Sequence, residues 1–213
     1  QSEYRKAQRE EKEYDTLRQN VDALLERPKE QKQHRQMFEW IPYFRAHNMS
    51  WDNPQDGSYT PPTGREVDRF AYHCAMAPAI TDMTPYHAPP EAFALAREMK
   101  AIWHRAAELM LTGDYYPLTL CRRDPRDFYA MQFHNSDSGQ GFFQVLANSQ
   151  CTPGLFAARL KGLKEGARYR IEDLESHTVK HLTGAQMMTE IPVELPRRTG
   201  VIWFYEEEKE NSL

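Results

Sequence analysis

Residues 89–113, PPEAFALAREMKAIWHRAAELMLTG, separate two kinds of sequence pattern. Pro90 suits the first turn of a helix, and Gly113 is typical of the residue just past a helix end. Between them, apolar residues recur at helical spacing: Phe93, Leu95, Ala96, Met99, Ile102, Trp103 and Ala106. The stretch therefore predicts a helix with one buried face.

The run before this helix, FAYHCAMAPAI at residues 70–80, is short, apolar and rich in small residues. Such a run is typical of a buried strand inside a parallel sheet or barrel. Strand, loop and helix in this order form one β/α unit. The part of the chain before Gly113 therefore predicts an α/β fold.

The hydrophobic period changes after Gly113. Short segments rich in aromatic and β-branched residues follow one another, separated by turn-forming residues, at 127–135, 139–148, 156–163, 167–175, 188–195 and 200–208. This pattern is typical of an antiparallel β-sandwich or barrel. We therefore expect two domains, an α/β domain at residues 1–114 and an all-β domain at residues 115–213.

The N-terminal region predicts a helix followed by a loop. Charges alternate in sign from Ser2 to about Leu25 over a short apolar stripe, and Pro28 is expected to close that helix. A short helix running into a loop or strand is expected before Pro42. Residues 48–66 are rich in Asn, Asp, Gly, Ser and Pro, which predicts a long loop, and long loops in compact domains tend to be functional.

The charge pattern limits the classes of partner. Lys and Arg total 27 against 31 Asp and Glu, and the basic residues are scattered among acidic ones, so no nucleic-acid partner is expected. The sequence shows neither an apolar run long enough for a bilayer nor a signal-peptide core, so no membrane partner is expected. The first residue is not methionine, which favours a fragment of a longer protein.

Cysteine and histidine spacing predicts neither a metal site nor a cofactor. Cys74, Cys121 and Cys151 are far apart and form no CxxC pair, so free buried thiols are expected. The closest histidines, His177 and His181, lie in a region that reads as strand and turn. We therefore expect no metal there and no cofactor in the chain.

Several segments together resemble the C-terminal part of bacterial α-galactosidases of glycoside hydrolase family 36. GDYYPLT at 113–119 resembles the link between a catalytic barrel and the β-sandwich that follows it. GLKEGARYRIEDLESHTVKHLTGAQMMTEIPVEL at 162–195 is similar to the sandwich, with TGAQMM in a loop. FEWIPYF at 38–44 and CAMAPAI at 74–80 resemble segments near barrel closure. The resemblance extends over about residues 36–205.

The resemblance implies a fold of α/β plus all-β class: late strands and helices of a (β/α)8 barrel at 1–114, followed by an antiparallel β-sandwich at 115–213. It also implies retaining hydrolysis of terminal α-galactosides by a nucleophile and an acid/base that lie about 5 to 5.5 Å apart. The nucleophile's strand would precede residue 1, so the chain is expected to be an incomplete enzyme, inactive alone.

The position of the acid/base is left open by the sequence. The family's Arg-Ser-Asp triplet, which carries the acid/base, has no equivalent here. Asp22, Glu26 and the non-acidic Arg27 compete for the position, and Asp22 and Glu26 are the acidic candidates. The lost nucleophile and triplet favour an alternative reading, a non-catalytic carbohydrate-binding or structural interaction module.

Three residues are candidates for contacts with a sugar. Trp51 supplies an aromatic platform and Asp52 a carboxylate that accepts paired hydroxyl groups, although a loop anchored by a buried tryptophan is the favoured explanation of the pair. Trp40 is the third candidate, but its apolar neighbours favour a place in the core. The expected partners are an α-galactoside carbohydrate and either the missing upstream barrel portion or a second copy of the chain.

Overall fold

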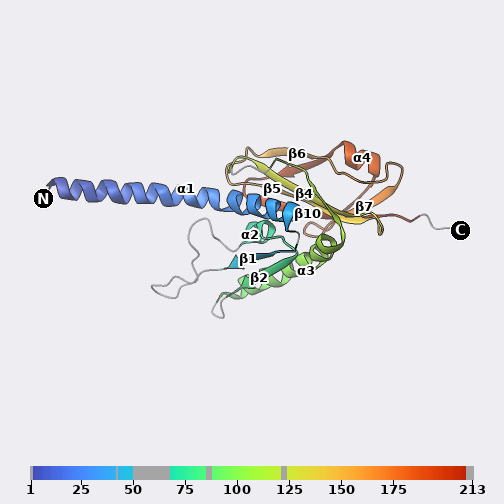
Figure 1. Cartoon of the computed structure of the whole chain (residues 1–213), viewed down its shortest axis with the longest axis horizontal. Helices are drawn as coiled ribbons and strands as arrows, with labels where there is room; N and C mark the ends of the chain where they lie inside the picture. Colours follow the sequence, from blue (N-terminus) through green and yellow to red (C-terminus); the bar gives the residue numbers. More distant parts are fainter. Residues whose placement is uncertain (1, 42, 50–67, 85–87, 121–123, 210–213) are drawn as a thin grey trace.

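The chain folds around a six-stranded antiparallel sheet that carries helices on one face and a small second sheet on the other (Figure 1). The computed structural model describes residues 2–41, 43–49, 68–84, 88–120 and 124–209. The helices are α1 (Ser2–Trp40), α2 (Arg69–Cys74), α3 (Pro90–Thr112) and α4 (Gly184–Thr189). The strands are β1 (Arg45–Met49), β2 (Ala79–Met83), β3 (Asp114–Pro117), β4 (Phe128–Asn135), β5 (Gln140–Ala147), β6 (Gly154–Ala158), β7 (Arg168–Asp173), β8 (Thr178–Thr183), β9 (Ile191–Leu195) and β10 (Thr199–Glu207).

The main sheet has the strand order β3-β4-β5-β10-β7-β8. Strands β4, β5, β7 and β10 coincide closely with aromatic segments of the sequence, whereas β3 and β8 were not predicted. The prediction of an antiparallel, β-rich C-terminal part is confirmed. The central pair β5 and β10 places Phe142 opposite Phe204 and Phe143 opposite Trp203. Successive side chains point to opposite faces of a strand. Phe142 and Phe204 therefore belong to one core of the protein, and Phe143 and Trp203 belong to the other.

The helical side of the sheet holds the first core. Phe133, Phe142 and Phe204 pack there with Met99 and Ile102 of α3. The predicted buried face of α3 is therefore confirmed. The same cluster reaches Phe38 of α1, so it crosses the predicted domain boundary at residue 114, and that division stays a prediction.

The other side of the sheet holds the second core. Phe143 and Trp203 contact the two-stranded antiparallel sheet β6-β9 through Val193 and Leu195, and Met187 of α4 completes the cluster. The second layer of the expected sandwich is thus a two-stranded sheet with one short helix. Trp203 is 8% exposed and lies in this second core.

Strands β1 and β2 form a separate two-stranded parallel sheet beside α2 and α3 (Figure 1). In β1, Phe44 just before the strand and Ala46 are buried, whereas Arg45 and His47 are exposed. The buried residues belong to the core shared with α3, so one face of the pair is covered and the other is open. The described residues contain one pair of parallel strands. They do not contain the further strands of a (β/α)8 barrel, so the barrel is not confirmed.

Helix α1 is longer than the sequence predicts. Pro28 was expected to end it, but the helix continues to Trp40. The turns after Pro28 are held by packing, because Gln31, His34 and Phe38 are buried against the body of the protein. This burial outweighs the hydrogen bond that a proline removes inside a helix. The preceding part of α1 extends away from the sheets (Figure 1).

Polar contacts fix the buried end of α1. The amides of Gln31 and Asn148 pair reciprocally, with Nε2 to Oδ1 at 2.9 Å and Nδ2 to Oε1 at 3.0 Å. The His34 ring donates from Nδ1 to the Cys74 carbonyl at 3.0 Å, and Arg35 donates to the Thr119 carbonyl. Helix α1 is thus anchored both to α2 and to the end of β5.

Two further predictions of secondary structure are wrong. Residues 70–80 were expected to form one strand, but α2 occupies the first half and β2 begins only at Ala79. The carboxylate of Asp68 accepts a hydrogen bond from the Ala71 amide at 3.0 Å and so caps α2. The helix was not predicted because the apolar run that follows Asp68 is too short to show a helical period. The TGAQMM segment was expected to be a loop, but Thr183 and Gln186 form a capping box that begins α4.

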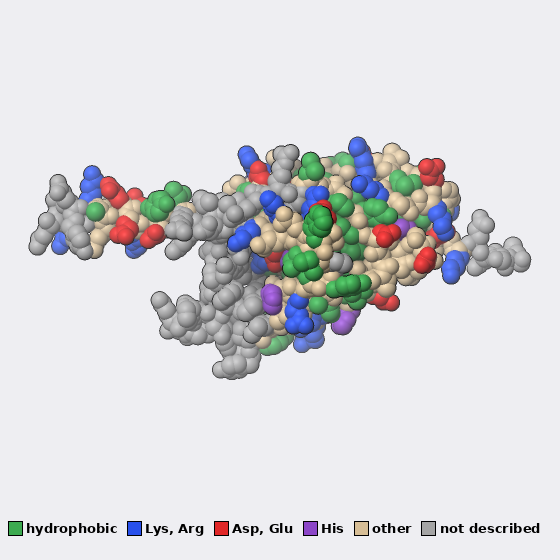
Figure 2. Space-filling model, viewed as in Figure 1, with side chains coloured by type: hydrophobic (Ala, Val, Ile, Leu, Met, Phe, Trp, Pro, Cys, Tyr) green, Lys and Arg blue, Asp and Glu red, His purple; other side chains and the backbone are tan. Residues whose placement is uncertain are grey.

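No helix in the described ranges is both long and apolar enough to cross a membrane. Cys74 and Cys151 are free and buried, as predicted, while Cys121 lies outside the described residues. On the face shown in Figure 2, Lys and Arg side chains are interspersed with Asp and Glu.

Two buried histidines, His34 on α1 and His134 on β4, make stability depend on pH. Burial lowers the pKa of both rings from the usual value of 6.5. In the unfolded chain the same rings take up protons at about pH 6.5. Below that pH the unfolded state binds protons that the folded state does not, so the folded state loses stability as the pH falls.

We expect the free energy of unfolding to fall between about pH 7.5 and about pH 5.5, measured by urea denaturation. His34→Gln keeps a donor for the Cys74 carbonyl but does not titrate. Its loss of stability over the same range is therefore expected to be smaller than that of the parent chain. Equal losses in the two proteins would contradict this assignment.

Candidate functional site

The open face of the β1-β2 pair is the first candidate site. In parallel α/β folds, binding and catalytic groups lie at the carboxyl ends of the strands. His47 and Thr81 lie opposite each other in the register close to those ends, and His47 is exposed. Asp82 points to the covered side: its side chain is 1% exposed, and its Oδ2 lies 3.0 Å from Nζ of Lys100 on α3. The open face thus presents an imidazole and a hydroxyl group.

The catalytic candidates from the sequence both lie on α1. The backbones of Asp22 and Glu26 are helical and four residues apart, but their side chains lie outside the described part of the chain. Arg27, the third contender, pairs with Glu30 at 2.7 Å, which gives it a structural role. The acid/base assignment therefore stays a prediction.

The sugar-contact candidates are only partly placed. Trp51 and Asp52 lie outside the described residues; in sequence they closely follow β1. Trp40 ends α1 and is 82% exposed, so its interpretation as a core residue is wrong. The exposed ring of Trp40 is available to a partner. Trp103, by contrast, is partly buried, and its indole nitrogen donates to the Ala77 carbonyl at 2.8 Å.

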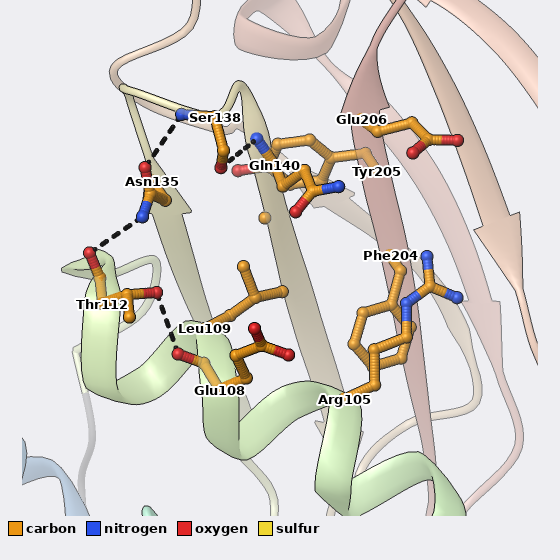
Figure 3. Close-up of a pocket in the computed structure, with 11 residues that line it drawn as sticks. Arg105, Glu108, Leu109, Thr112, Asn135, Ser138, Gln140, Phe204, Tyr205 and Glu206 are labelled. Carbon is orange, nitrogen blue, oxygen red and sulfur yellow. Dashed lines mark hydrogen bonds between the residues drawn. The ribbon is translucent and has the colours of Figure 1, made fainter.

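A groove between α3 and the main sheet is the second candidate site (Figure 3). It has a volume of about 220 Å³. It is lined by residues of α3, of the β4-β5 turn and of β10: Arg105, Glu108, Leu109, Thr112, Asn135, Ser138, Gln140, Gly141, Phe204, Tyr205 and Glu206. We call it the α3 groove.

Arg105 is held in place at one side of the α3 groove. Its guanidinium carbon lies 4.3 Å from the centre of the Phe204 ring, and its Nη1 lies 3.5 Å from Oε2 of Glu172. A second hydrogen bond to Glu172, from Arg170 at 2.9 Å, lowers the pKa of the Glu172 carboxyl and keeps it charged. The positive charge of Arg105 is therefore partly offset by a fixed negative neighbour.

The rim of the α3 groove is also ordered by hydrogen bonds. Asn135 donates to the carbonyl of Thr112 at 3.1 Å and accepts from the backbone amide of Ser138 at 3.0 Å. The Ser138 hydroxyl in turn accepts from the backbone amide of Gln140. By contrast, no side-chain hydrogen bond joins the Glu108 carboxylate or the Gln140 amide to any other described residue. Figure 3 shows these two groups directed into the groove.

Neither site holds a cluster of metal ligands, since no group of three or more His, Cys, Asp or Glu with suitable geometry occurs among the described residues. A cysteine nucleophile is also disfavoured at the buried thiol of Cys74. Burial raises the pKa of Cys74 to about 12, so its thiol stays protonated at neutral pH.

The sequence interpretation missed the α3 groove. Its helical members did carry a signal, because Arg105, Glu108 and Thr112 are spaced by three and four residues and share one face of the predicted helix. Gln140 and Glu206 carried none, since their pairing across β5 and β10 appears only with the strand order.

No protein-family model matches the sequence. No curated protein matches it either. Among solved structures, the chain is similar to the galactosidase domain of alpha-galactosidase-sucrose kinase, AgaSK, with a TM-score of 0.54 and 19% sequence identity over 76% of this chain and 22% of that chain. It is also similar to a GH36 alpha-galactosidase, AgaA, from Geobacillus stearothermophilus, a variant solved with stachyose, with a TM-score of 0.55 and 20% identity over 76% of this chain and 21% of that chain.

These similarities confirm the sequence resemblance at the level of the fold. At such identities the likeness concerns the fold alone. The chain spans about a fifth of the length of the two α-galactosidase structures that it matches.

Proposed function

We propose that the chain is the C-terminal portion of a retaining α-galactosidase-like glycoside hydrolase that acts on terminal α-galactosides. In this proposal β1, α2, β2 and α3 are the last elements of a (β/α)8 barrel, and the antiparallel sheets form the domain that follows it. The observation that carries the proposal is the parallel β1-β2 pair, covered on one face and open on the other, which leads through α3 into the six-stranded sheet.

The strand edges of this pair support the proposal. Within the described residues β1 pairs only with β2, and β2 only with β1, so each strand has one edge without a sheet partner. Unpaired edges favour the addition of further strands, and closure into a barrel removes them. The similarity of fold to two α-galactosidase structures, which are about five times longer than the matched region, is consistent with strands supplied from outside this segment.

The chemistry then divides between this chain and the rest of the barrel. Retention needs two carboxyl groups about 5 to 5.5 Å apart. The described side chains of the open face, among them Arg45, His47 and Thr81, include no carboxylate, so the nucleophile is assigned to an upstream strand. Asp22 or Glu26 remains the proposed acid/base.

The sugar itself is assigned to residues that flank β1 in sequence. Trp51 and Asp52 follow β1 in sequence, and Trp40 precedes it with an exposed ring. An aromatic ring can pack on the apolar face of a pyranose ring, and a carboxylate accepts hydrogen bonds from its hydroxyl groups. These three residues remain the proposed contacts to an α-galactoside.

The test is release of nitrophenol from an aryl α-galactoside, with the aryl β-galactoside as control. We expect no turnover by the 213-residue chain, and turnover of the α-anomer alone when the chain is produced with the sequence that precedes it in its gene. In that longer protein, replacing the true acid/base, by Asp22→Asn or Glu26→Gln, is expected to lower kcat/KM by about 100-fold or more.

Two results would count against the proposal. Turnover of the α-anomer by the 213-residue chain, lost in Asp22→Asn, would show that the chain assembles a whole site by itself. A folded longer protein without α-galactosidase activity would instead favour the non-catalytic module.

A further inference from the structure

We propose that the α3 groove binds one ring of a neutral carbohydrate. This inference goes beyond the proposed hydrolysis and does not depend on it, because none of the groove residues lies on β1 or β2. The groove is formed by α3, the β4-β5 turn and β10, all within the described part of the chain.

The size of the groove sets the size of the ligand. Its volume of about 220 Å³ is several times the roughly 30 Å³ that one water molecule occupies in the liquid. It is below the roughly 300 to 1,000 Å³ of sites that enclose drug-sized molecules. A single sugar ring fits this range, whereas a long oligosaccharide would extend beyond the rim.

The polar groups on the groove match the hydroxyl groups of a sugar. The Glu108 carboxylate accepts hydrogen bonds, the Arg105 guanidinium donates them, and the Gln140 amide does both. Vicinal hydroxyl groups likewise donate and accept. Because Glu108 and Gln140 have no side-chain hydrogen bonds to other described residues, a bound ring would gain contacts without displacing protein partners.

The charges favour a neutral ligand over an anion. Arg105 faces Glu172 at 3.5 Å, and Glu206 faces Arg170 at 3.8 Å, so these charges already have opposite neighbours. Glu108 adds a negative charge that would repel an anion. A small organic cation is the competing ligand, since it would pair with Glu108 alone. Titration with sugars and with an organic cation distinguishes these two classes of ligand.

The groove is also largely preformed. Leu109 is 8% exposed and Phe204 1% exposed, so the floor belongs to the packed core. The hydrogen bonds among Thr112, Asn135 and Ser138 hold the rim. A preformed site loses little conformational entropy on binding, so even a ligand with a few hydrogen bonds is expected to bind measurably.

The test is a titration of the folded 213-residue chain, followed by amide NMR signals. The probes are methyl α-galactoside, methyl α-glucoside and, for the competing ligand, ethylammonium chloride. We expect at least one sugar to shift the amide signals of Gln140 and Gly141, with a Kd on the order of millimolar, typical of a few exposed hydrogen bonds.

Glu108→Ala is expected to raise that Kd about fivefold or more. Glu165→Gln removes an exposed carboxylate that does not line the groove and is expected to leave the Kd unchanged. In the longer, active protein Glu108→Ala is expected to leave hydrolysis of the aryl α-galactoside unchanged, which keeps this test separate from that of the proposed function.

The proposal is overturned if neither sugar shifts the groove signals, if ethylammonium alone does, or if Glu108→Ala and Glu165→Gln bind the sugar equally well.

Discussion

Gly141→Ala is expected to destabilise the protein by about 3 kcal/mol or more, and to lower Tm by about 10 °C for a chain of this size. A Cβ at this position would overlap the ring and hydroxyl group of Tyr205 and the carbonyl oxygen of Phe133. Neither neighbour is free to move. Phe133 belongs to the paired strand β4, and Tyr205 is 2% exposed with its hydroxyl bonded to Gln132 at 3.0 Å.

Gly166→Ala is the matched control. A Cβ at Gly166 meets no atom within 4 Å, and this glycine is exposed. Thermal unfolding of the two variants therefore separates the overlap at β5 from the general effect of replacing glycine. A Gly141→Ala protein as stable as Gly166→Ala would show that Tyr205 leaves more room than its contacts indicate.

Asn148→Leu is expected to cost about 3 kcal/mol of unfolding free energy, because it leaves buried polar groups without their partners. Asn148 exchanges two hydrogen bonds with Gln31 and donates a third to the Asp127 carbonyl at 2.8 Å. Gln31 is 1% exposed and Asn148 2% exposed, so water does not replace what is lost. Urea denaturation measures the effect.

The double variant Gln31→Met with Asn148→Leu supplies the control. The double variant has apolar groups of similar size in place of both amides, so it lacks the Gln31 amide that Asn148→Leu alone leaves unpaired. Its loss of unfolding free energy is therefore expected to be about 2 kcal/mol smaller than the sum of the losses in the single variants. Simple additivity would mean that the two amides do not stabilise the protein through each other.

The regular parts of the fold were predictable because their patterns are local. The apolar spacing of residues 93–106 was enough to place α3, and the alternating aromatic segments were enough to place β4, β5, β7 and β10. The continuation of α1 past Pro28 was not predictable, since it depends on Asn148, a partner 117 residues away. Likewise α2 and α4 are each six residues long, too short to show a period.

The candidate sites were less predictable than the fold. The apolar neighbours of Trp40 in sequence favour a core residue, but at the end of α1 its ring is exposed. The exposure of His47 was not predictable, because it depends on which face of β1 the helices cover. The α3 groove joins residues from Arg105 to Glu206, so its members come together only through the order of the strands in the sheet.

The pairing of Gln31 with Asn148 has a consequence for synthesis on the ribosome. Helix α1 leaves the ribosome well before its amide partner, which follows 117 residues later. At about 5 to 20 residues per second, that interval lasts roughly 6 to 23 s. During it, the Gln31 amide lacks its partner, and Phe38 gains its neighbours Tyr115 and Phe133 only late in the interval. Until β5 has been made, α1 of the nascent chain is therefore undocked and accessible to chaperones. Docking of α1 is a late event in folding.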